Sequence, residues 1–158
     1  MKAASVQDIK SELSAHDKRS LVDLCMRLTR FKLENKELLT YLLFEAADEN
    51  NFVETVKEEI AASFDSLNVS HLYFVRKSLR KIIRQINKYT RYSGKPETEL
   101  ELRIFFCEKL KGSDIPYQRS EAILRLYTGQ VKKAEKTCSR MHEDIQFEYL
   151  KRIEKLKD

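Results

Sequence analysis

Residues 70–92 read SHLYFVRKSLRKIIRQINKYTRY, and this stretch decides the fold. Apolar side chains recur in it three and four positions apart, so they would share one face of a helix, while Arg and Lys cover the opposite arc. Ser70 is expected to cap this helix, and Gly94 and Pro96 follow its end. The pattern predicts one long amphipathic helix over about 71–92. Its apolar stripe comprises Leu72, Val75, Leu79, Ile82, Ile86 and Tyr89, with Ile83 beside it.

Helical spacing extends over the rest of the chain as well. Only 3 Gly and 2 Pro occur among the 158 residues, which is too few turn residues for a β protein. We therefore expect a single all-α domain over residues 1–158, with seven or eight helices. Either a compact bundle or an irregular α–α superhelix, resembling HEAT or TPR stacking without a regular repeat, fits the pattern. The other expected helices span about 6–13, 17–31, 36–47, 52–67, 97–111, 119–128 and 130–156.

The boundaries of these helices are predicted from caps and breakers. Asn35 is expected to cap the third helix, and Gly129 to end the helix at 119–128. A long final helix would then follow, with a near-heptad stripe from Val131 to Leu156. This stripe is expected either to pack in the core or to serve as the seam of a homodimer.

The charge of the chain is unevenly distributed. From Ser66 to Pro96 there is no Asp or Glu, and eight Lys and Arg give this segment a charge of +8 within a chain of net charge +5. Residues 45–65, directly before it, carry seven acids against the single base Lys57. The basicity is thus local to one predicted helix. The candidate anion-binding or nucleic-acid-binding residues are Arg76, Lys77, Arg80, Lys81, Arg84, Lys88 and Arg91.

Two interpretations of this basic helix are open. The basic face could pair with the acidic helix before it or with Glu97 to Glu101, since helices adjacent in sequence usually pack together. Alternatively, it stays exposed and binds phosphate groups, with Arg76, Arg80, Arg84 and Lys88 at successive i,i+4 steps along a nucleic-acid backbone. In that case Tyr73, Phe74, Tyr89 and Tyr92 would add stacking if they are exposed.

The chain lacks the motifs of catalysis and cofactor binding. Glu12 and His16 stand four apart, but one such pair is an incomplete metal site. The glycines are too scattered for a phosphate-cradling loop. Cys25, with His16 or His71 as base, is a possible nucleophile, but its place on an apolar helix face favours a small buried side chain. We expect no enzyme, no cofactor and no bound metal.

Cysteine usage and the N-terminus bear on the compartment. Cys25, Cys107 and Cys138 form an odd set without a C-x-x-C pair, which is typical of a reducing compartment. The first residues become polar before a signal peptide could form, and no segment approaches the ~20 apolar residues of a membrane span. The sequence therefore predicts a cytoplasmic protein.

The first third of the chain carries three short leucine- and lysine-rich segments at residues 8–13, 18–24 and 35–39, which read DIKSEL, KRSLVDL and NKELL. These segments resemble the N-terminal part of an uncharacterised bacterial all-helical domain family. The resemblance implies a helical fold and no known activity.

These observations favour a binding function. We expect a non-enzymatic protein-interaction or scaffold module, because the grooves between helices suit a protein partner and no catalytic constellation is present. The alternative is nucleic-acid binding through the basic face of the helix at about 71–92.

Overall fold

A computed structural model describes all residues from Met1 to Asp158. The chain forms eight α-helices, one short π-helical segment, one 3-10 turn and no strand. The all-α prediction is therefore confirmed. The chain divides into two compact units, which we call unit 1 (Met1–Phe44) and unit 2 (Glu45–Asp158) and describe separately. The expectation of a single domain over residues 1–158 stays a prediction.

Unit 1 contains α1 (Val6–Ala15), α2 (Lys18–Phe31) and α3 (Leu33–Thr40), and a π-helical segment, Tyr41–Glu45, continues from α3. Ser5 and Asp8 form a capping box at α1, and Asp17 caps α2 by accepting from the Ser20 backbone N–H at 2.7 Å. The prediction that Asn35 caps a helix is wrong. Asn35 lies inside α3 and donates to the Leu28 carbonyl at the end of α2 instead, at 2.8 Å.

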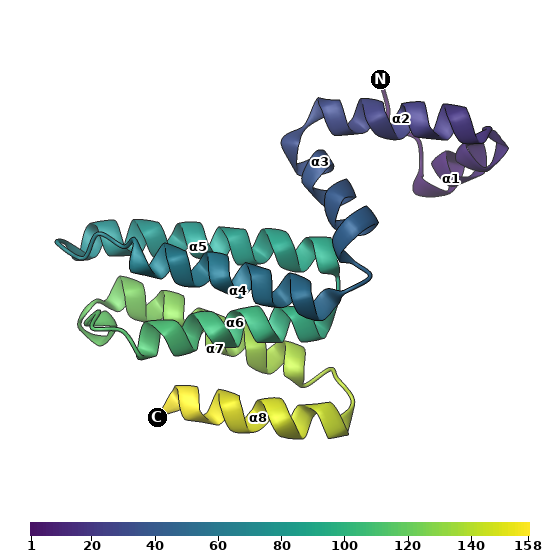
Figure 1. The fold of residues 1–158 in the computed structure, drawn as a ribbon. Coiled ribbons are helices and arrows are strands. Elements are labelled where there is room, and N and C mark those ends of the chain that lie inside the picture. The colour runs from purple at the N-terminus through teal and green to yellow at the C-terminus, as the bar shows by residue number, and fades with distance from the viewer. The chain divides into compact units, whose positions relative to one another are not determined.

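Unit 2 is a bundle of five helices that lie side by side in Figure 1: α4 (Glu49–Asp65), α5 (Leu72–Ser93), α6 (Pro96–Lys111), α7 (Glu121–Cys138) and α8 (Glu143–Lys157). The helix at the centre is α6, which contacts each of the other four. Eight of its 16 residues are buried, as such a central place requires. Its buried residues are Thr98, Leu100, Leu102, Arg103, Ile104, Phe106, Cys107 and Leu110.

The predicted amphipathic helix is present as α5, within one residue of the expected limits. His71 rather than Ser70 is the residue before its first turn, and Gly94 ends it in the left-handed conformation at φ 66°. Pro96 then opens α6, where its missing N–H costs nothing. Five apolar residues of α5 are buried in the bundle: Val75, Leu79, Ile82, Ile83 and Ile86.

The last third of unit 2 differs from the prediction. Gly129 does not end a helix, because α7 continues through it to Cys138, and the expected final helix over 130–156 is two helices. A glycine inside a helix destabilises it by about 1 kcal/mol relative to alanine. Burial of the neighbouring side chains stabilises the helix by more than this. The chain breaks at residues 139–142 instead, and α8 folds back along the bundle. The side chains of α7 buried around Gly129 are Tyr127, Gln130, Val131 and Ala134.

Two of the long-range contacts of α8 hold it against α7 and α6. The Tyr127 hydroxyl of α7 donates to the Leu156 carbonyl at 2.7 Å, and Lys111 Nζ of α6 donates to the Lys155 carbonyl at 2.6 Å. Val131 and Leu156, at the two ends of the stripe, are both buried within unit 2. Ile145, in the middle of the stripe, is exposed. Homodimerisation stays a prediction.

Candidate nucleic-acid interface

The cations of α5 lie on the arc opposite its buried residues. We call the seven predicted cations Arg76, Lys77, Arg80, Lys81, Arg84, Lys88 and Arg91 the basic face. Five of them are exposed, and Arg76 and Lys88 are half-buried. At 1.5 Å per residue, the face is about 22 Å long from Arg76 to Arg91.

Glu54 and Glu59 of α4 bond to residues outside this face. Glu54 pairs with Lys57 of its own helix at 2.8 Å. Glu59 accepts hydrogen bonds from Gln85 at 2.6 Å and from the Tyr89 hydroxyl at 3.0 Å. Both α5 donors stand beside the basic face rather than on it, so these two bonds to Glu59 come from neutral side chains.

A third acid of α4, Glu49, lies at the turn between α5 and α6. Its carboxylate accepts from Ser93 and Thr98, each at 2.5 Å, and pairs with Lys95 at 3.0 Å. This carboxylate therefore fastens the start of α4 to the start of α6. It neutralises Lys95, which lies beyond the end of α5 and outside the basic face.

Six cations of the basic face have no ion pair: Arg76, Lys77, Arg80, Lys81, Arg84 and Arg91. Two of the other expected acidic partners are engaged elsewhere: Glu99 pairs with Arg103, and Glu101 pairs with Lys57 and Arg152. Glu97 has no ion pair with the face or with any other residue. The interpretation in which acidic neighbours cover the basic face is therefore wrong for these six residues.

Two aromatic residues at the first turn of α5 are open to solvent. The side chain of Tyr73 is 61% exposed, and the Arg76 guanidinium lies over its ring at 5.7 Å. Phe74 is 44% exposed and contacts Tyr73 edge to face at 5.5 Å. Tyr89 and Tyr92 are half-buried and contact each other, so the exposed stacking surface is confined to the N-terminal end of the helix.

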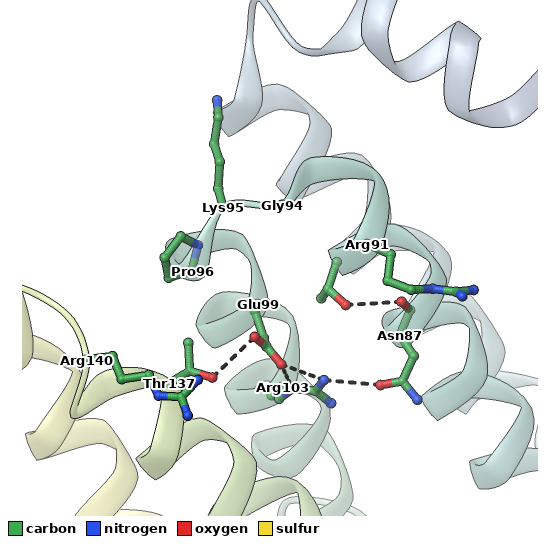
Figure 2. Close-up of a pocket in the computed structure, with 10 residues that line it drawn as sticks. Asn87, Arg91, Gly94, Lys95, Pro96, Glu99, Arg103, Thr137 and Arg140 are labelled. Atoms are coloured by element: carbon green, nitrogen blue, oxygen red, sulfur yellow. Dashed lines mark hydrogen bonds and ion pairs between the residues drawn. The ribbon is translucent and has the colours of Figure 1, made fainter. Parts of the chain in front are cut away.

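At the other end of α5 the surface is hollowed into a cavity of about 500 Å³ between α5, α6 and α7, which we call the Arg103 pocket (Figure 2). Arg103 of α6 is 4% exposed and bonds to three neighbours around it. It pairs with Glu99 at 2.6 Å and donates to Gln130 at 2.6 Å and to Asn87 at 3.1 Å. Sequence reasoning missed this pocket, because its lining comes from three helices.

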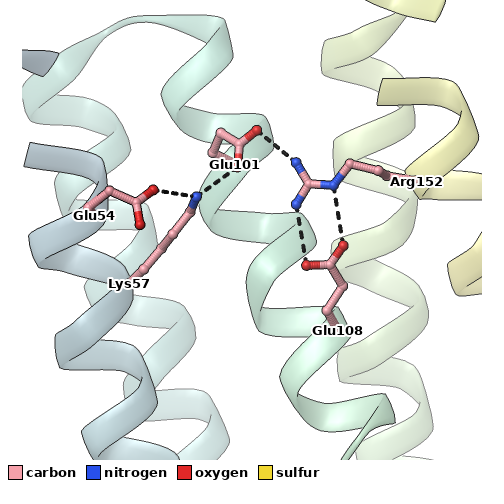
Figure 3. Close-up of polar contacts among 5 residues, drawn as sticks. All are labelled: Glu54, Lys57, Glu101, Glu108 and Arg152. Carbon is pink, nitrogen blue, oxygen red and sulfur yellow. Dashed lines mark hydrogen bonds and ion pairs between the residues drawn. The ribbon is translucent and has the colours of Figure 1, made fainter. Parts of the chain in front are cut away.

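A second polar cluster joins α4, α6 and α8 on another side of the bundle (Figure 3). Lys57 bridges Glu54 and Glu101 at 2.8 and 2.9 Å, and Arg152 bridges Glu101 and Glu108 at 2.8 and 3.3 Å. Burial opposes the charge of Glu101, but the hydrogen bond from Lys57 and the charges of Arg152 and Lys57 outweigh it and lower the pKa of Glu101. Because every charge in the cluster has a partner, we assign it a structural role.

The cysteines and histidines do not form a reactive constellation. Burial raises the pKa of Cys107 to about 12 and also raises the pKa of Cys138. Cys25, expected to be buried, is exposed because the short helices of unit 1 do not enclose a core. His16 Nδ1 contacts the carbonyl of Glu12, its own helix neighbour, at 2.9 Å. No group of three or more His, Cys, Asp or Glu is placed to hold a metal ion.

Comparisons with protein-family models, curated proteins and solved structures give no match for this chain. The resemblance of the first third to a bacterial helical domain family stays a prediction. None of the helices combines the length and the apolar composition that a membrane crossing requires.

Proposed function

We propose that unit 2 is a non-enzymatic binding module that holds single-stranded nucleic acid along the basic face of α5. The observation that carries this proposal is the row of six cations without ion pairs on one exposed helix face. Like charges three and four residues apart destabilise a helix by about 0.2–0.5 kcal/mol per pair, so the row has an energetic cost in the free protein. A polyanion would offset it by releasing its counterions on binding.

The shape of the face favours a single strand. Its length of about 22 Å spans roughly six nucleotides at the 3.4 Å spacing of a strand in duplex DNA. Tyr73 and Phe74 offer aromatic rings at one end of it, and exposed aromatic residues beside a basic groove are how proteins hold unpaired bases. A base-paired duplex has no unstacked base for these rings.

The test is fluorescence anisotropy with labelled single-stranded RNA and DNA over a salt series. The variant Arg80→Gln/Arg84→Gln removes two charges from the basic face. The matched control Lys132→Gln/Lys133→Gln removes two exposed charges from α7. We expect the α5 variant to bind at least about tenfold more weakly and its log–log salt slope to become less negative by about 1.4, two contacts at 0.7 each.

Either of two results would contradict the proposal. One is the absence of binding at low salt. The other is an equal loss of affinity in the α5 variant and in the α7 control, which would indicate attraction by net charge alone.

A second candidate function is protein binding through unit 1, which the sequence analysis also favours. The helices α2 and α3 enclose an apolar groove of about 230 Å³ that is open to solvent, lined by Cys25, Leu28, Leu38, Leu39 and Leu42. Four exposed cations, at positions 27, 30, 32 and 36, exceed the two acids of the same stretch, Glu34 and Glu37. The occupant that fits this surface is an acidic amphipathic helix of a partner protein.

Cys25 provides the test of this second candidate, because it is exposed and lines the groove. A photo-crosslinker attached to it should capture acidic amphipathic segments of other proteins in cells, and Leu28→Asp should abolish the capture. Cross-links that lead only to unit 2 of the same chain, or to a second copy of it, would overturn this candidate.

A further inference from the structure

The Arg103 pocket is basic at its rim. Arg91 of α5 and Arg140, just beyond α7, line it, are exposed and have no ion pair. One carboxylate, that of Glu99, is present in the lining. Figure 2 shows Glu99 between Thr137 and Arg103, and dashed lines join it to both. Its charge is therefore already matched by Arg103, and the two rim arginines remain available for a ligand.

The floor of the pocket is fixed in advance. Arg103 bonds to Glu99, Gln130 and Asn87, which come from all three helices that form the walls. The Thr137 hydroxyl donates to the second oxygen of Glu99 at 3.2 Å. No buried side-chain nitrogen or oxygen lacks a partner. A site with a rigid floor loses little entropy when a ligand binds.

Arg91 belongs both to the basic face and to the lining of the pocket. It is the last cation of the face, so a strand lying on α5 would reach the pocket at one of its ends. A terminal phosphate monoester carries about −1.5 to −2 charges at pH 7, more than the single charge of an internal phosphate. Two arginines at the mouth of a cavity suit such a group, because a guanidinium can bind phosphate oxygens bidentately.

We propose that the Arg103 pocket binds the terminal phosphate of a nucleic-acid strand whose backbone lies on the basic face, so that the protein prefers phosphorylated strand ends. This inference rests on the proposed function of α5. The same chemistry could come from a free nucleotide, and the experiment separates the two sources.

The experiment measures anisotropy with one oligonucleotide sequence in three forms: with a 5′-phosphate, with a 3′-phosphate, or with hydroxyls at both ends. We expect one phosphorylated form to bind about tenfold more tightly than the hydroxyl form, the gain from one charge-assisted hydrogen bond. Arg140→Ala should abolish this preference and should weaken binding of the hydroxyl form no more than the loss of an arginine outside the pocket does. Arg125→Ala, on α7 but outside the pocket, is the matched control and should keep the preference.

The possible results separate the inference from the function on which it rests. Binding of all three oligonucleotides with equal affinity would overturn the pocket assignment and leave the basic face supported. Absence of any binding would overturn both. A preference that survives Arg140→Ala would place the phosphate elsewhere. Competition by a nucleoside monophosphate as strong as that of the phosphorylated strand would indicate a free nucleotide instead of a strand end.

Discussion

Arg103 and Gln130 meet across the interface between α6 and α7, where the guanidinium donates to the amide oxygen at 2.6 Å in a place that solvent scarcely reaches. The same guanidinium holds Glu99 and Asn87, so one side chain connects three helices. Arg103→Ala would leave these partners without their donor. Removing one member of a buried charged network lowers the free energy of unfolding by about 3–5 kcal/mol. We expect a decrease of about 2–4 kcal/mol here, because Glu99 is partly exposed. Urea unfolding followed by circular dichroism measures this decrease in the free energy of unfolding.

The control for this substitution is Arg125→Ala. Arg125 also pairs with a glutamate four residues earlier, Glu121, but both side chains are exposed. Such surface ion pairs contribute about 0–1 kcal/mol to the free energy of unfolding. Equal destabilisation by the two variants would show that burial adds nothing at Arg103.

Arg80→Glu should change stability and binding in opposite directions. In the folded chain Arg80 has Arg76 and Arg84 four residues away on either side, and the substitution turns two repulsions into two attractions. We expect the free energy of unfolding to rise by roughly 0.5–1 kcal/mol while affinity for single strands falls. Thermal unfolding at low salt and anisotropy on the same sample measure both. A destabilised Arg80→Glu variant would mean that the arginine has a structural partner.

Gly129→Ala should stabilise the protein. Gly129 lies within α7, its φ is not in the left-handed region, and a Cβ added to it would meet no atom within 4 Å. The alanine lowers the backbone entropy of the unfolded chain, so we expect a gain of about 0.5–1 kcal/mol. Gly94→Ala is the matched contrast and should destabilise, because φ is 66° there. Thermal unfolding of both variants tests this pair.

The cluster around Glu101 should make stability depend on pH. The pKa of Glu101 is lowered in the folded protein from its ordinary value of 4.5. Its charge therefore contributes stability above about pH 4.5, and that contribution is lost as the pH falls through the lower folded pKa. Glu101→Gln should be less stable than the parent at pH 7, and the difference should shrink towards pH 3. Unfolding by urea at a series of pH values measures this difference.

Glu97 supplies the control for the pH experiment, since it is exposed and has no ion pair. Glu97→Gln should leave the pH profile of stability nearly unchanged. If the difference between Glu101→Gln and the parent were constant from pH 3 to pH 7, the glutamate would not be acting through its charge.

The parts of this fold that were predicted correctly are those that local sequence controls. The helix at 71–92 has a full apolar stripe and ends in Gly94 and Pro96, so its limits follow from the sequence to within one residue. The helix end predicted at Gly129 is wrong, because α7 continues through it. The sequence favours a break there, but the packing of α7 against α6 outweighs the cost of one glycine.

The candidate site was predictable only where local sequence determines it. The seven cations of the basic face follow from helical periodicity alone. The lack of ion pairs at six of them, all but Lys88, does not, because it depends on where Glu54 and Glu59 point once α4 is packed. The spacing of Glu99 and Arg103 was a local signal of an ion pair. Nothing near them in sequence indicated that Asn87 and Gln130 would complete the network.

The central position of α6 has a consequence for how the chain is synthesised. Eight of the 16 residues of this helix are buried, and two of the helices that cover it, α7 and α8, leave the ribosome after it does. Until Ile153 and Leu156 have emerged, the nascent bundle exposes a surface that other chains can bind. A proteolytic cut that removes α8 would leave that surface uncovered for the lifetime of the protein.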